Sequence, residues 1–281
     1  MTVINRLTEG FLTVFGDLKV YRWPMFLIYD PGGYEIKGPA VREVMNAVRP
    51  GDILVRGYKT YLDSYFIPGY FNHAGLYLGE VAPRDLDRVR LHAGRSQFRA
   101  GEQMVIHALA EGVLMEDLLN FCRCDYMAVL RFPQRIQAEV GRDFPRIPRE
   151  TYTPEEQRIS SRLEEGKPLR FEEIFPVIFD VALANLGRPY DFHFDFADFR
   201  HLCCTEFVYF CTKSLGAFLG IEPLARRVLL VKKKMVIPDA FVRSGLELVW
   251  RSPTADQTKL GELRRTPEGA EREEVAAQAI A

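Results

Sequence analysis

Long apolar runs are missing from this sequence of 281 residues, although hydrophobic residues make up 47% of it. Every uninterrupted apolar run is far too short to span a bilayer, so no integral membrane segment is predicted. Arg6, Glu9 and Asp17 interrupt the apolar residues near the N-terminus, and therefore no secretory h-region is predicted. We expect a soluble, cytoplasmic protein. A peripheral membrane contact through an amphipathic helix at residues 2–15 stays open, with packing on the domain as the default.

The sequence also lacks an excess of either charge, since 37 Lys and Arg residues balance 38 Asp and Glu residues. A net charge of −1 gives no general attraction to nucleic acid, so no nucleic-acid partner is predicted. The five cysteines are an odd number without a secreted context, which predicts reduced thiols. No Cys-x-x-Cys pair supports a metal site, and no Gly-rich loop has the strand and helix neighbours that would hold a nucleotide cofactor.

A helix that begins with a thiol is predicted from Leu202 to Cys211. Cys204, Val208 and Cys211 recur at helical spacing on one face. A cysteine at the start of a helix lies beside unpaired backbone N–H groups and the positive end of the helix dipole, and both favour the thiolate. The alternative is that Cys204 is one more small buried apolar residue, which is the commoner role of a free cysteine.

A strand that begins with a histidine is predicted at residues 72–79. Ala74, Leu76 and Leu78 alternate onto one face, which leaves His73 on the other face at the beginning of the strand. A single histidine is more often structural than catalytic. A thiol at a helix start together with a histidine on a separate strand is nevertheless the arrangement that a cysteine nucleophile needs.

The order of the predicted elements indicates the fold class. Strands are predicted at residues 52–56, 73–79, 104–108 and 125–132, after a helix at 39–47. Helices dominate the later part of the chain, and Thr153, Pro154 and Glu156 have the capping pattern of a helix start. Several strands followed by helices are typical of an α+β domain with an antiparallel sheet.

Four motifs, in this order, carry a resemblance to a known family. They are residues 49–54 (RPGDIL), 73–79 (HAGLYLG), 186–192 (LGRPYDF) and 204–208 (CTEFV). A later motif at residues 237–241 (IPDAF) is similar to the closing motif of the same group. The sequence resembles the circularly permuted, papain-like cysteine hydrolases of the NlpC superfamily, in the YiiX/YaeF-like group. Unpermuted relatives place the cysteine helix before the histidine strand, whereas here the histidine comes first.

The resemblance implies a permuted papain-like, NlpC-type α+β fold, in which an antiparallel sheet or half-barrel packs against the helix that carries the nucleophilic cysteine. It also implies a cysteine peptidase or amidase that cleaves a peptide-like amide bond through a Cys-His acyl-enzyme, with no cofactor. One alternative is an LRAT-like acyltransferase or lipid ester or amide hydrolase, so the expected substrate is a small peptide-like molecule or an acyl lipid. A second alternative is a non-catalytic binding module that retains the fold.

Three residues are predicted to be catalytic: Cys204, His73 and His107. Cys204 is preferred to Cys203 because the family places its cysteine directly before a Ser or Thr and a Glu, here Thr205-Glu206. His73 is the expected base. His107 is expected to hold one nitrogen of His73 so that the other nitrogen faces the thiol. Relatives often carry a carboxylate or another polar residue at this strand position, and the orienting role therefore stays open.

Two further residues are predicted to contact the reacting group or the substrate. Tyr190 is expected to donate its hydroxyl to the oxyanion together with the backbone N–H of Cys204, and its alternative role is a packed aromatic ring. Asp191 belongs to an acidic cluster with Asp195 and Asp198 that would suit a substrate amine. The alternative for this cluster is a set of solvated loop carboxylates.

The chain is predicted to divide into three parts. Residues 1–48 form an N-terminal extension that packs on the domain. Residues 49–250 form the permuted papain-like catalytic domain, with an insertion at about 133–170 where apolar residues become sparse. Residues 251–281 are polar and charged, and they are predicted to form a flexible tail.

Overall fold

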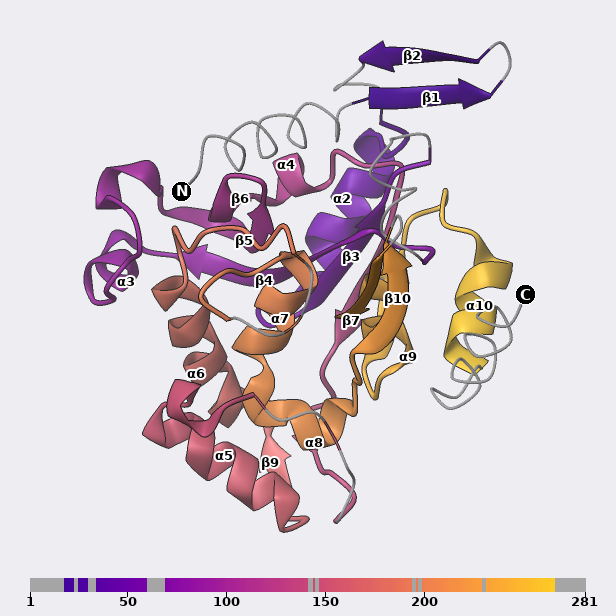
Figure 1. Cartoon of the computed structure of the whole chain (residues 1–281). Helices are drawn as coiled ribbons and strands as arrows, with labels where there is room; N and C mark the ends of the chain where they lie inside the picture. The colour runs from indigo at the N-terminus through magenta and orange to yellow at the C-terminus, as the bar shows by residue number, and fades with distance from the viewer. Residues whose placement is uncertain are drawn as a thin grey trace.

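The computed structural model describes residues 18–22, 25–29, 34–59, 69–140, 144, 147–193, 196, 199–228 and 231–265. A six-stranded antiparallel sheet with the strand order β12-β7-β3-β4-β5-β6 forms its centre (Figure 1). In chain order its strands are β3 (Ile53–Gly57), β4 (His73–Val81), β5 (Gly101–Leu109), β6 (Gly112–Asp117), β7 (Tyr126–Arg131) and β12 (Glu247–Arg251). The predicted α+β class with an antiparallel sheet is confirmed.

Helices and short strand pairs surround this sheet. The helices are α2 (Gly38–Ala47), α3 (Pro83–Asp87), α4 (Leu118–Phe121), α5 (Pro154–Glu164), α6 (Phe171–Ala184), α7 (Cys204–Cys211), α8 (Gly216–Leu219), α9 (Pro238–Arg243) and α10 (Gln257–Arg265). The strand pairs are β1 (Leu18–Arg22) with β2 (Met25–Tyr29), β8 (Arg135–Ile136) with β9 (Leu169–Arg170), and β10 (Leu224–Val228) with β11 (Val231–Met235). No described helix combines the length and the apolar character needed to cross a membrane.

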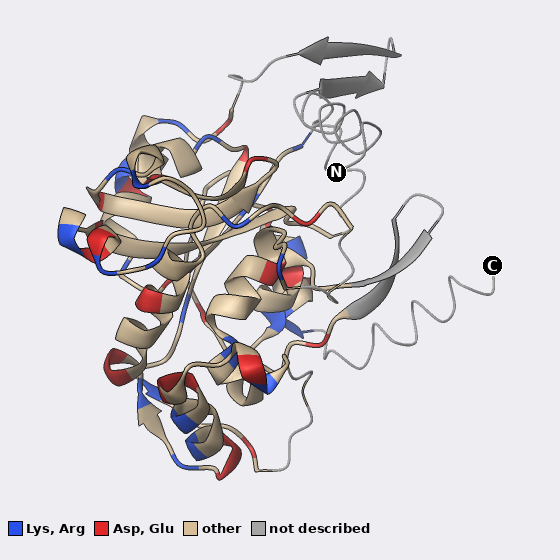
Figure 2. Ribbon diagram, turned by 60° about the vertical axis from the view of Figure 1, so that its left-hand side comes forward, with Lys and Arg blue, Asp and Glu red and all other residues tan. Residues whose placement is uncertain are grey.

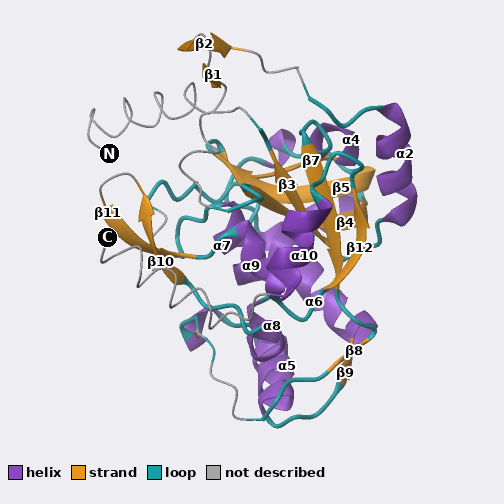
Figure 3. Ribbon diagram, turned by 90° about the vertical axis from the view of Figure 1, so that its right-hand side faces the viewer, coloured by secondary structure: helices purple, strands orange, loops and turns teal. Residues whose placement is uncertain are grey.

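The two faces of the sheet carry separate apolar layers because side chains alternate along each strand. On one face, Leu76 and Ile106 belong to the larger core, which includes residues of α6, α7 and α9. On the other face, Tyr77 and Val105 pack with residues of α2 and α4. Figure 3 shows the resulting layers, with the orange sheet between these purple helices. The alternation predicted for residues 73–79 is therefore confirmed.

Helix α7 is the most deeply enclosed of these elements. All of its residues from Cys204 to Cys211 are buried, and it packs against β4 and β5. Phe207 and Val208 are fully inaccessible to solvent. The predicted helix and its first residue are confirmed, and its apolar character follows from burial on every side rather than along one stripe.

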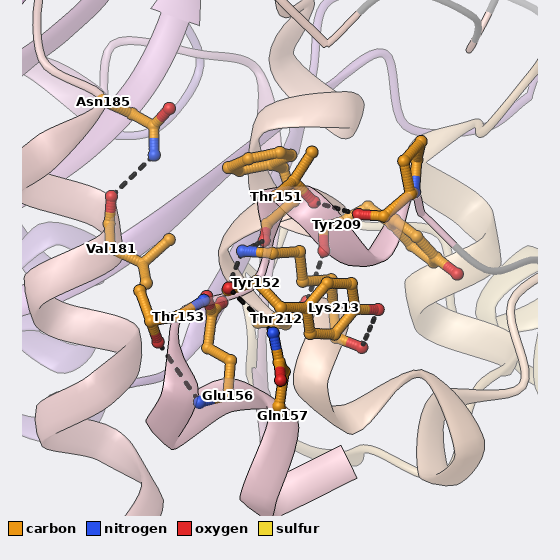
Figure 4. Close-up of polar contacts among 12 residues, drawn as sticks. Thr151, Tyr152, Thr153, Glu156, Gln157, Val181, Asn185, Tyr209, Thr212 and Lys213 are labelled. Carbon is orange, nitrogen blue, oxygen red and sulfur yellow. Dashed lines mark hydrogen bonds and ion pairs between the residues drawn. The ribbon is translucent and has the colours of Figure 1, made fainter. Parts of the chain in front are cut away.

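A buried ion pair attaches α5 to the chain just beyond α7. Nζ of Lys213 pairs with Oε1 of Glu156, and both side chains are only 1% exposed. Glu156 also caps α5, because its Oε2 accepts the backbone N–H of Thr153 at 2.8 Å. Figure 4 shows Lys213 beside Tyr152 and Glu156 in this cluster. The capping pattern predicted at Thr153 is confirmed, and this charged pair fixes α5 against the end of the α7 segment.

Charged residues otherwise lie around the apolar layers. In Figure 2 the blue and red segments are interspersed along the surrounding helices and loops, while most of the central strands are tan. Helix α10 lies within the segment predicted as a flexible tail, and its Leu260 is 2% exposed and belongs to the larger core. The burial of this leucine shows that α10 packs against the domain. The predicted amphipathic helix at 2–15 and residues 266–281 lie outside the described residues.

Candidate active site

The Cys-Thr-Glu motif forms the start of α7. Cys203 is the N-cap residue, and its backbone N–H donates to Oε2 of Glu206 at 3.0 Å. The hydroxyl of Thr205 donates to the carbonyl oxygen of Val236 at 2.7 Å, which ties the helix start to the segment before α9. Cys204 is the first residue of the helix and is 3% exposed. The motif therefore holds the thiol in place through its two neighbours, while Cys203 is buried beside it as a cap.

The sulfur of Cys204 lies where β4 and β5 separate. The ladder between these strands starts at Leu76 and Ile106, so the first residues of β4 lie beyond it. The backbone N–H of Ala74 instead donates a hydrogen bond to the Cys204 sulfur. Backbone N–H groups of a strand lie in the plane of the sheet, and side chains from either face can approach a sulfur bound there. Because Ala74 follows His73 directly, the thiol lies beside the backbone of His73.

His73 and His107 form a direct contact across β4 and β5. Nε2 of His73 lies 2.8 Å from Nδ1 of His107, and the two rings are nearly perpendicular at 87°. Both rings also contact the ring of Phe121 in α4, which places them on the α4 face of the sheet. His107 is 0% exposed and His73 is 8% exposed. The structure thus brings the two predicted histidines together at the strand end that meets Cys204.

This cluster also contains two charged residues that no sequence motif indicated. Oε1 of Glu116 in β6 lies 3.0 Å from Nε2 of His107. Nη1 of Arg56 in β3 lies 3.8 Å from the same carboxylate oxygen and donates to the carbonyl oxygen of Phe121 at 2.7 Å. Arg56 stands at the end of an apolar strand, a pattern that could have indicated a buried partner. Glu116 has no comparable signal in the sequence.

The buried thiol is protonated at neutral pH. Burial raises the pKa of Cys204 to about 11, although the N–H groups of Ala74 and Thr205 oppose that rise. The expectation that the helix start favours the thiolate is therefore corrected, because desolvation outweighs the helix N-terminus at this position. Burial raises the pKa of Cys122 to about 12 and also raises the pKa values of Cys124, Cys203 and Cys211. Cys204 is more acidic than Cys122, Cys124 and Cys211.

Both histidines of the cluster are neutral at the same pH. Burial, the positive charge of Arg56 and the neighbouring His107 lower the pKa of His73 well below 6.5. Burial and Arg56 also lower the pKa of His107, and Glu116 opposes this effect. A neutral imidazole has one N–H and one free lone pair. At neutral pH the thiol of Cys204 and the rings of His73 and His107 are thus all uncharged.

Tyr190 approaches the same thiol from a turn that precedes α7 in the chain. Gly187 has a positive φ of 80°, and the turn around it exchanges backbone hydrogen bonds with Val113 at the start of β6. Burial raises the pKa of Tyr190 well above 10, and the negative charges that Cys204 and its neighbours can carry raise it further. The glycine turn therefore places the phenol in the electrostatic surroundings of Cys204.

Asp191 lies beside Tyr190, away from solvent. It is 5% exposed, its Oδ1 accepts the backbone N–H of His193 at 2.7 Å, and its Oδ2 is buried without a hydrogen-bond partner. Burial raises the pKa of nearby Glu206 to about 7, and Asp191 contributes to that rise. Of its predicted cluster, Asp195 and Asp198 lie outside the described residues. The solvated-carboxylate alternative is therefore wrong for Asp191 itself.

The motif at residues 237–241 supports the strand that carries His73. Oδ2 and Oδ1 of Asp239 accept the backbone N–H groups of Tyr70 and Phe71 at 2.7 and 2.8 Å. Asp239 is 1% exposed. Two charge-assisted bonds to one buried carboxylate fix the chain two residues before His73.

Histidine, cysteine and acidic side chains can also bind metal ions. Among the described residues, no group of three or more His, Cys, Asp and Glu side chains is arranged to hold a metal ion. The remaining histidines, His92, His193 and His201, are all exposed. The described ionisable groups that interact with Cys204 include Glu206, Arg56 and Tyr190.

Part of the chain that builds this geometry matches a known family. Residues 47–145 match a family described as "Permuted papain-like amidase enzyme, YaeF/YiiX, C92 family". This segment belongs to the permuted papain-like amidases. The expected YiiX/YaeF-like resemblance and the permuted papain-like fold are therefore confirmed, and the family consists of amidase enzymes. The matched segment contains His73, His107 and Glu116, and it ends before Cys204.

One solved structure is also similar to this chain. The crystal structure of the metalloprotein yiiX from Escherichia coli O157:H7 shares 14% sequence identity, and the match covers 73% of this chain and 98% of that chain at a TM-score of 0.40. An overlap this weak transfers neither residue roles nor a metal to the present protein. No curated protein of similar sequence was found.

Proposed function

We propose that this protein hydrolyses an amide bond through a thioester intermediate, with Cys204 as the nucleophile and His73 as its base. One observation carries the proposal. The Cys204 sulfur is bound to the backbone N–H that follows His73, while Nε2 of His73 is engaged by His107. The remaining nitrogen, Nδ1 of His73, is the base that this arrangement leaves for the thiol.

The first chemical step is attack of the thiol on the amide carbonyl. Nδ1 of His73 takes the proton from Cys204 as the sulfur–carbon bond forms, and the carbonyl π electrons move to the oxygen. The pKa of about 11 for Cys204 and the lowered pKa of His73 favour proton transfer together with attack rather than a resting ion pair. The imidazolium then gives its proton to the leaving nitrogen, the carbon–nitrogen bond breaks, and a thioester remains on Cys204.

Water completes the cycle by attacking the thioester. His73 removes a proton from that water, the carbon–sulfur bond breaks, and a carboxylic acid and the Cys204 thiol are restored. The backbone N–H of Cys204 at the helix start and the hydroxyl of Tyr190 are proposed to donate to the oxyanion in both steps. The buried Oδ2 of Asp191 is proposed to contact the substrate.

Intact-mass spectrometry tests the proposal most directly. The protein is incubated with a panel of peptides containing γ-glutamyl and D-amino-acid bonds, and with acyl amides and lipid esters. We expect the peptide that contains Cys204 to gain the mass of one acyl group. In His73→Ala, hydrolysis of this acyl group from Cys204 should be slower. Cys203→Ala is the matched control and should still form the adduct. Amide cleavage that persists in Cys204→Ala, or the absence of any adduct and cleavage across the panel, would contradict the hydrolase function.

The same experiment separates the other two functions. An LRAT-like acyltransferase would pass the acyl group from Cys204 to an alcohol or amine acceptor faster than to water. A binding module would retain substrates without any change in their mass. The identity of the released product therefore distinguishes hydrolysis from transfer.

A further inference from the structure

Three side chains form a continuous contact chain from β6 to β4. Oε1 of Glu116 lies 3.0 Å from Nε2 of His107, an ion-pair distance whose angle leaves that nitrogen without a hydrogen bond, and Nδ1 of His107 lies 2.8 Å from Nε2 of His73. Glu116 faces Val105 in the β5–β6 ladder, two positions before His107, so both side chains project from the same face. The amide-cleaving mechanism proposed above uses His73 and His107 and leaves Glu116 without a role.

We propose that Glu116 is a positioning residue that sets the tautomer of His107 and, through it, the tautomer of His73. The inference rests on the proposed function in so far as it names which nitrogen of His73 serves Cys204. It assigns no direct contact between Glu116 and the substrate. It states which ring atoms carry protons in the resting protein.

The assignment follows from the hydrogen-bonding capacity of each group. An ionised carboxylate repels a ring lone pair and attracts an N–H, and at 3.0 Å from Glu116 the Nε2 atom of His107 is therefore the nitrogen that carries the proton. A neutral imidazole has one N–H, and Nδ1 of His107 is then an acceptor. Nε2 of His73 must therefore donate to it. The lone pair of His73 remains on Nδ1, which is the atom the mechanism requires as a base.

Arg56 keeps Glu116 in the ionised form, which is the form that attracts an N–H. Its guanidinium is buried, with Nη1 3.8 Å from Oε1 of Glu116, and it lies 4.2 Å from the ring centroid of Phe121. Burial by itself raises the pKa of Glu116, but the contacts with His107 and Arg56 outweigh it and hold that pKa below 4.5. The charge of Arg56 also disfavours protonation of both histidines. Each ring is consequently neutral, and its tautomer is the variable that remains.

An amide at position 116 would remove this constraint. The NH₂ group of a glutamine can donate to Nε2 of His107, which moves the proton of His107 to Nδ1. His107 would then donate to Nε2 of His73, and the proton of His73 would move to Nδ1. The base would be lost from the side of Cys204, although every residue of the proposed mechanism would still be present.

Imidazole nitrogen NMR on the substrate-free, full-length protein reads these tautomers directly. The ring signals of His73 and His107 are assigned from spectra of their Gln variants. In the wild-type protein we expect both rings to carry the proton on Nε2. In Glu116→Gln we expect the Nδ1–H form of both rings to appear, whereas Glu116→Asp should preserve the Nε2–H form because it keeps a carboxylate.

Asp117→Asn is the matched control. Asp117 is the next carboxylate of β6, is exposed, and caps α4 by accepting the backbone N–H of Leu119 at 2.8 Å. An asparagine is an equally good cap. This variant removes one negative charge beside Glu116 without altering a contact of His107, and it should leave both spectra unchanged.

Turnover provides the second measurement. Glu116→Gln should lower kcat by roughly 10²-fold with little change in KM. This is less than the roughly 10⁴-fold loss that a wrong tautomer causes at the histidine next to a serine nucleophile, because Glu116 acts one ring further away. The dependence of kcat on pH between about pH 5 and 8 reports on His107 together with its titratable and charged neighbours. These neighbours are His73, Arg56, Glu111 and Glu116. Asp117→Asn should retain both constants.

Two spectral outcomes would overturn the inference. One is a wild-type His107 that carries its proton on Nδ1, and the other is a Glu116→Gln spectrum identical to that of the wild type. The wild-type spectrum alone decides the first of these, even if the Gln variant does not fold. Because the tautomers are measured without substrate, failure of Cys204 to form an acyl adduct would contradict the proposed function separately.

Discussion

The sulfur of Cys204 accepts a hydrogen bond from the backbone N–H of Ala74. Strand β4 begins at His73, before its ladder with β5 starts at Leu76, and helix α7 packs against both strands. An in-plane donor at a strand end is a fixed group, since the strand itself sets its direction. The thiol is therefore held next to Ala74 by backbone geometry rather than by a flexible side chain.

This arrangement predicts a close approach between the thiol and the imidazole. The sulfur of Cys204 and Nδ1 of His73 should lie within roughly 3 to 5 Å of each other, allowing for loose contacts in a free enzyme. A crystal structure of the substrate-free protein measures this distance. A His73 ring nitrogen far outside this range, with both residues well ordered, would contradict the proposed catalytic pair.

Alkylation should be selective for Cys204 and should increase with pH. With a pKa of about 11, the thiolate fraction of Cys204 grows about tenfold per pH unit between pH 7 and 9. Cys122, Cys124 and Cys211 have higher pKa values, and burial raises the pKa of Cys203 well above its ordinary value, so these four thiols should react more slowly with iodoacetamide. Peptide mass spectrometry of the folded protein checks the order, and the urea-unfolded protein, in which all five should react alike, is the control. Faster labelling of Cys122 or Cys203 would refute it.

Acid should destabilise the fold through its buried histidines. The pKa values of His73 and His107 lie below the ordinary value of 6.5, so below pH 6.5 the unfolded chain binds protons that the folded chain does not. The associated stability is present above pH 6.5 and is lost as the pH falls toward the folded-state pKa values, by about 1.4 kcal/mol per pH unit for each ring.

The histidine contribution is measured by comparing variants. Urea unfolding at pH 6.5 and 5.5 should give a shallower pH slope for His107→Gln than for the wild type, by at most about 1 kcal/mol over this interval. Glu206 contributes with the opposite sign, because its folded-state pKa is raised to about 7, but it does so in both proteins. His201→Gln, at an exposed position, should keep the wild-type slope. Equal slopes for all three proteins would show that His107 is protonated freely in the fold.

The buried ion pair between Lys213 and Glu156 should show strong coupling. Lys213→Met leaves Glu156 buried without its cation, and it should lower the free energy of unfolding by about 3 to 5 kcal/mol. Adding Glu156→Gln removes the unpaired charge and keeps an acceptor for the N–H of Thr153, so the double variant should be more stable than the sum of the single changes predicts. Chemical denaturation of the four proteins completes the cycle. Additive losses would indicate that the two charges do not interact.

Asp239 should stabilise the segment before His73 through both of its oxygens. In Asp239→Asn one accepting oxygen becomes an NH₂ group that faces a backbone N–H, so the free energy of unfolding should fall by about 3 kcal/mol. Asp256→Asn is the control, because Asp256 accepts the N–H of Thr258 at an exposed helix start, where the two residue types are nearly equivalent. A loss for Asp239→Asn as small as the control's would show that its bonds to Tyr70 and Phe71 contribute little.

Local patterns in the sequence were sufficient to predict the helix and the strand that carry Cys204 and His73. The start of α7 at Cys204 follows from helical spacing, and the start of β4 at His73 follows from alternation, because both signals depend only on residues a few positions apart. The ordered motifs predicted the family whose description residues 47–145 match. They also located the thiol and the imidazole on separate elements, but they carried no information on the protonation of either group.

Only the tertiary structure decided the electrostatics. The pKa of Cys204 is raised because packing removes the thiol from water, and no local pattern reports how completely a helix start is enclosed. Glu116 reaches His107, and Arg56 reaches Glu116, because β3, β5 and β6 belong to one sheet. Asp239 meets Phe71 across 168 positions of sequence. Burial and long-range charge contacts depend on which elements pack together, and that choice is made by the whole fold rather than by the residues near each group.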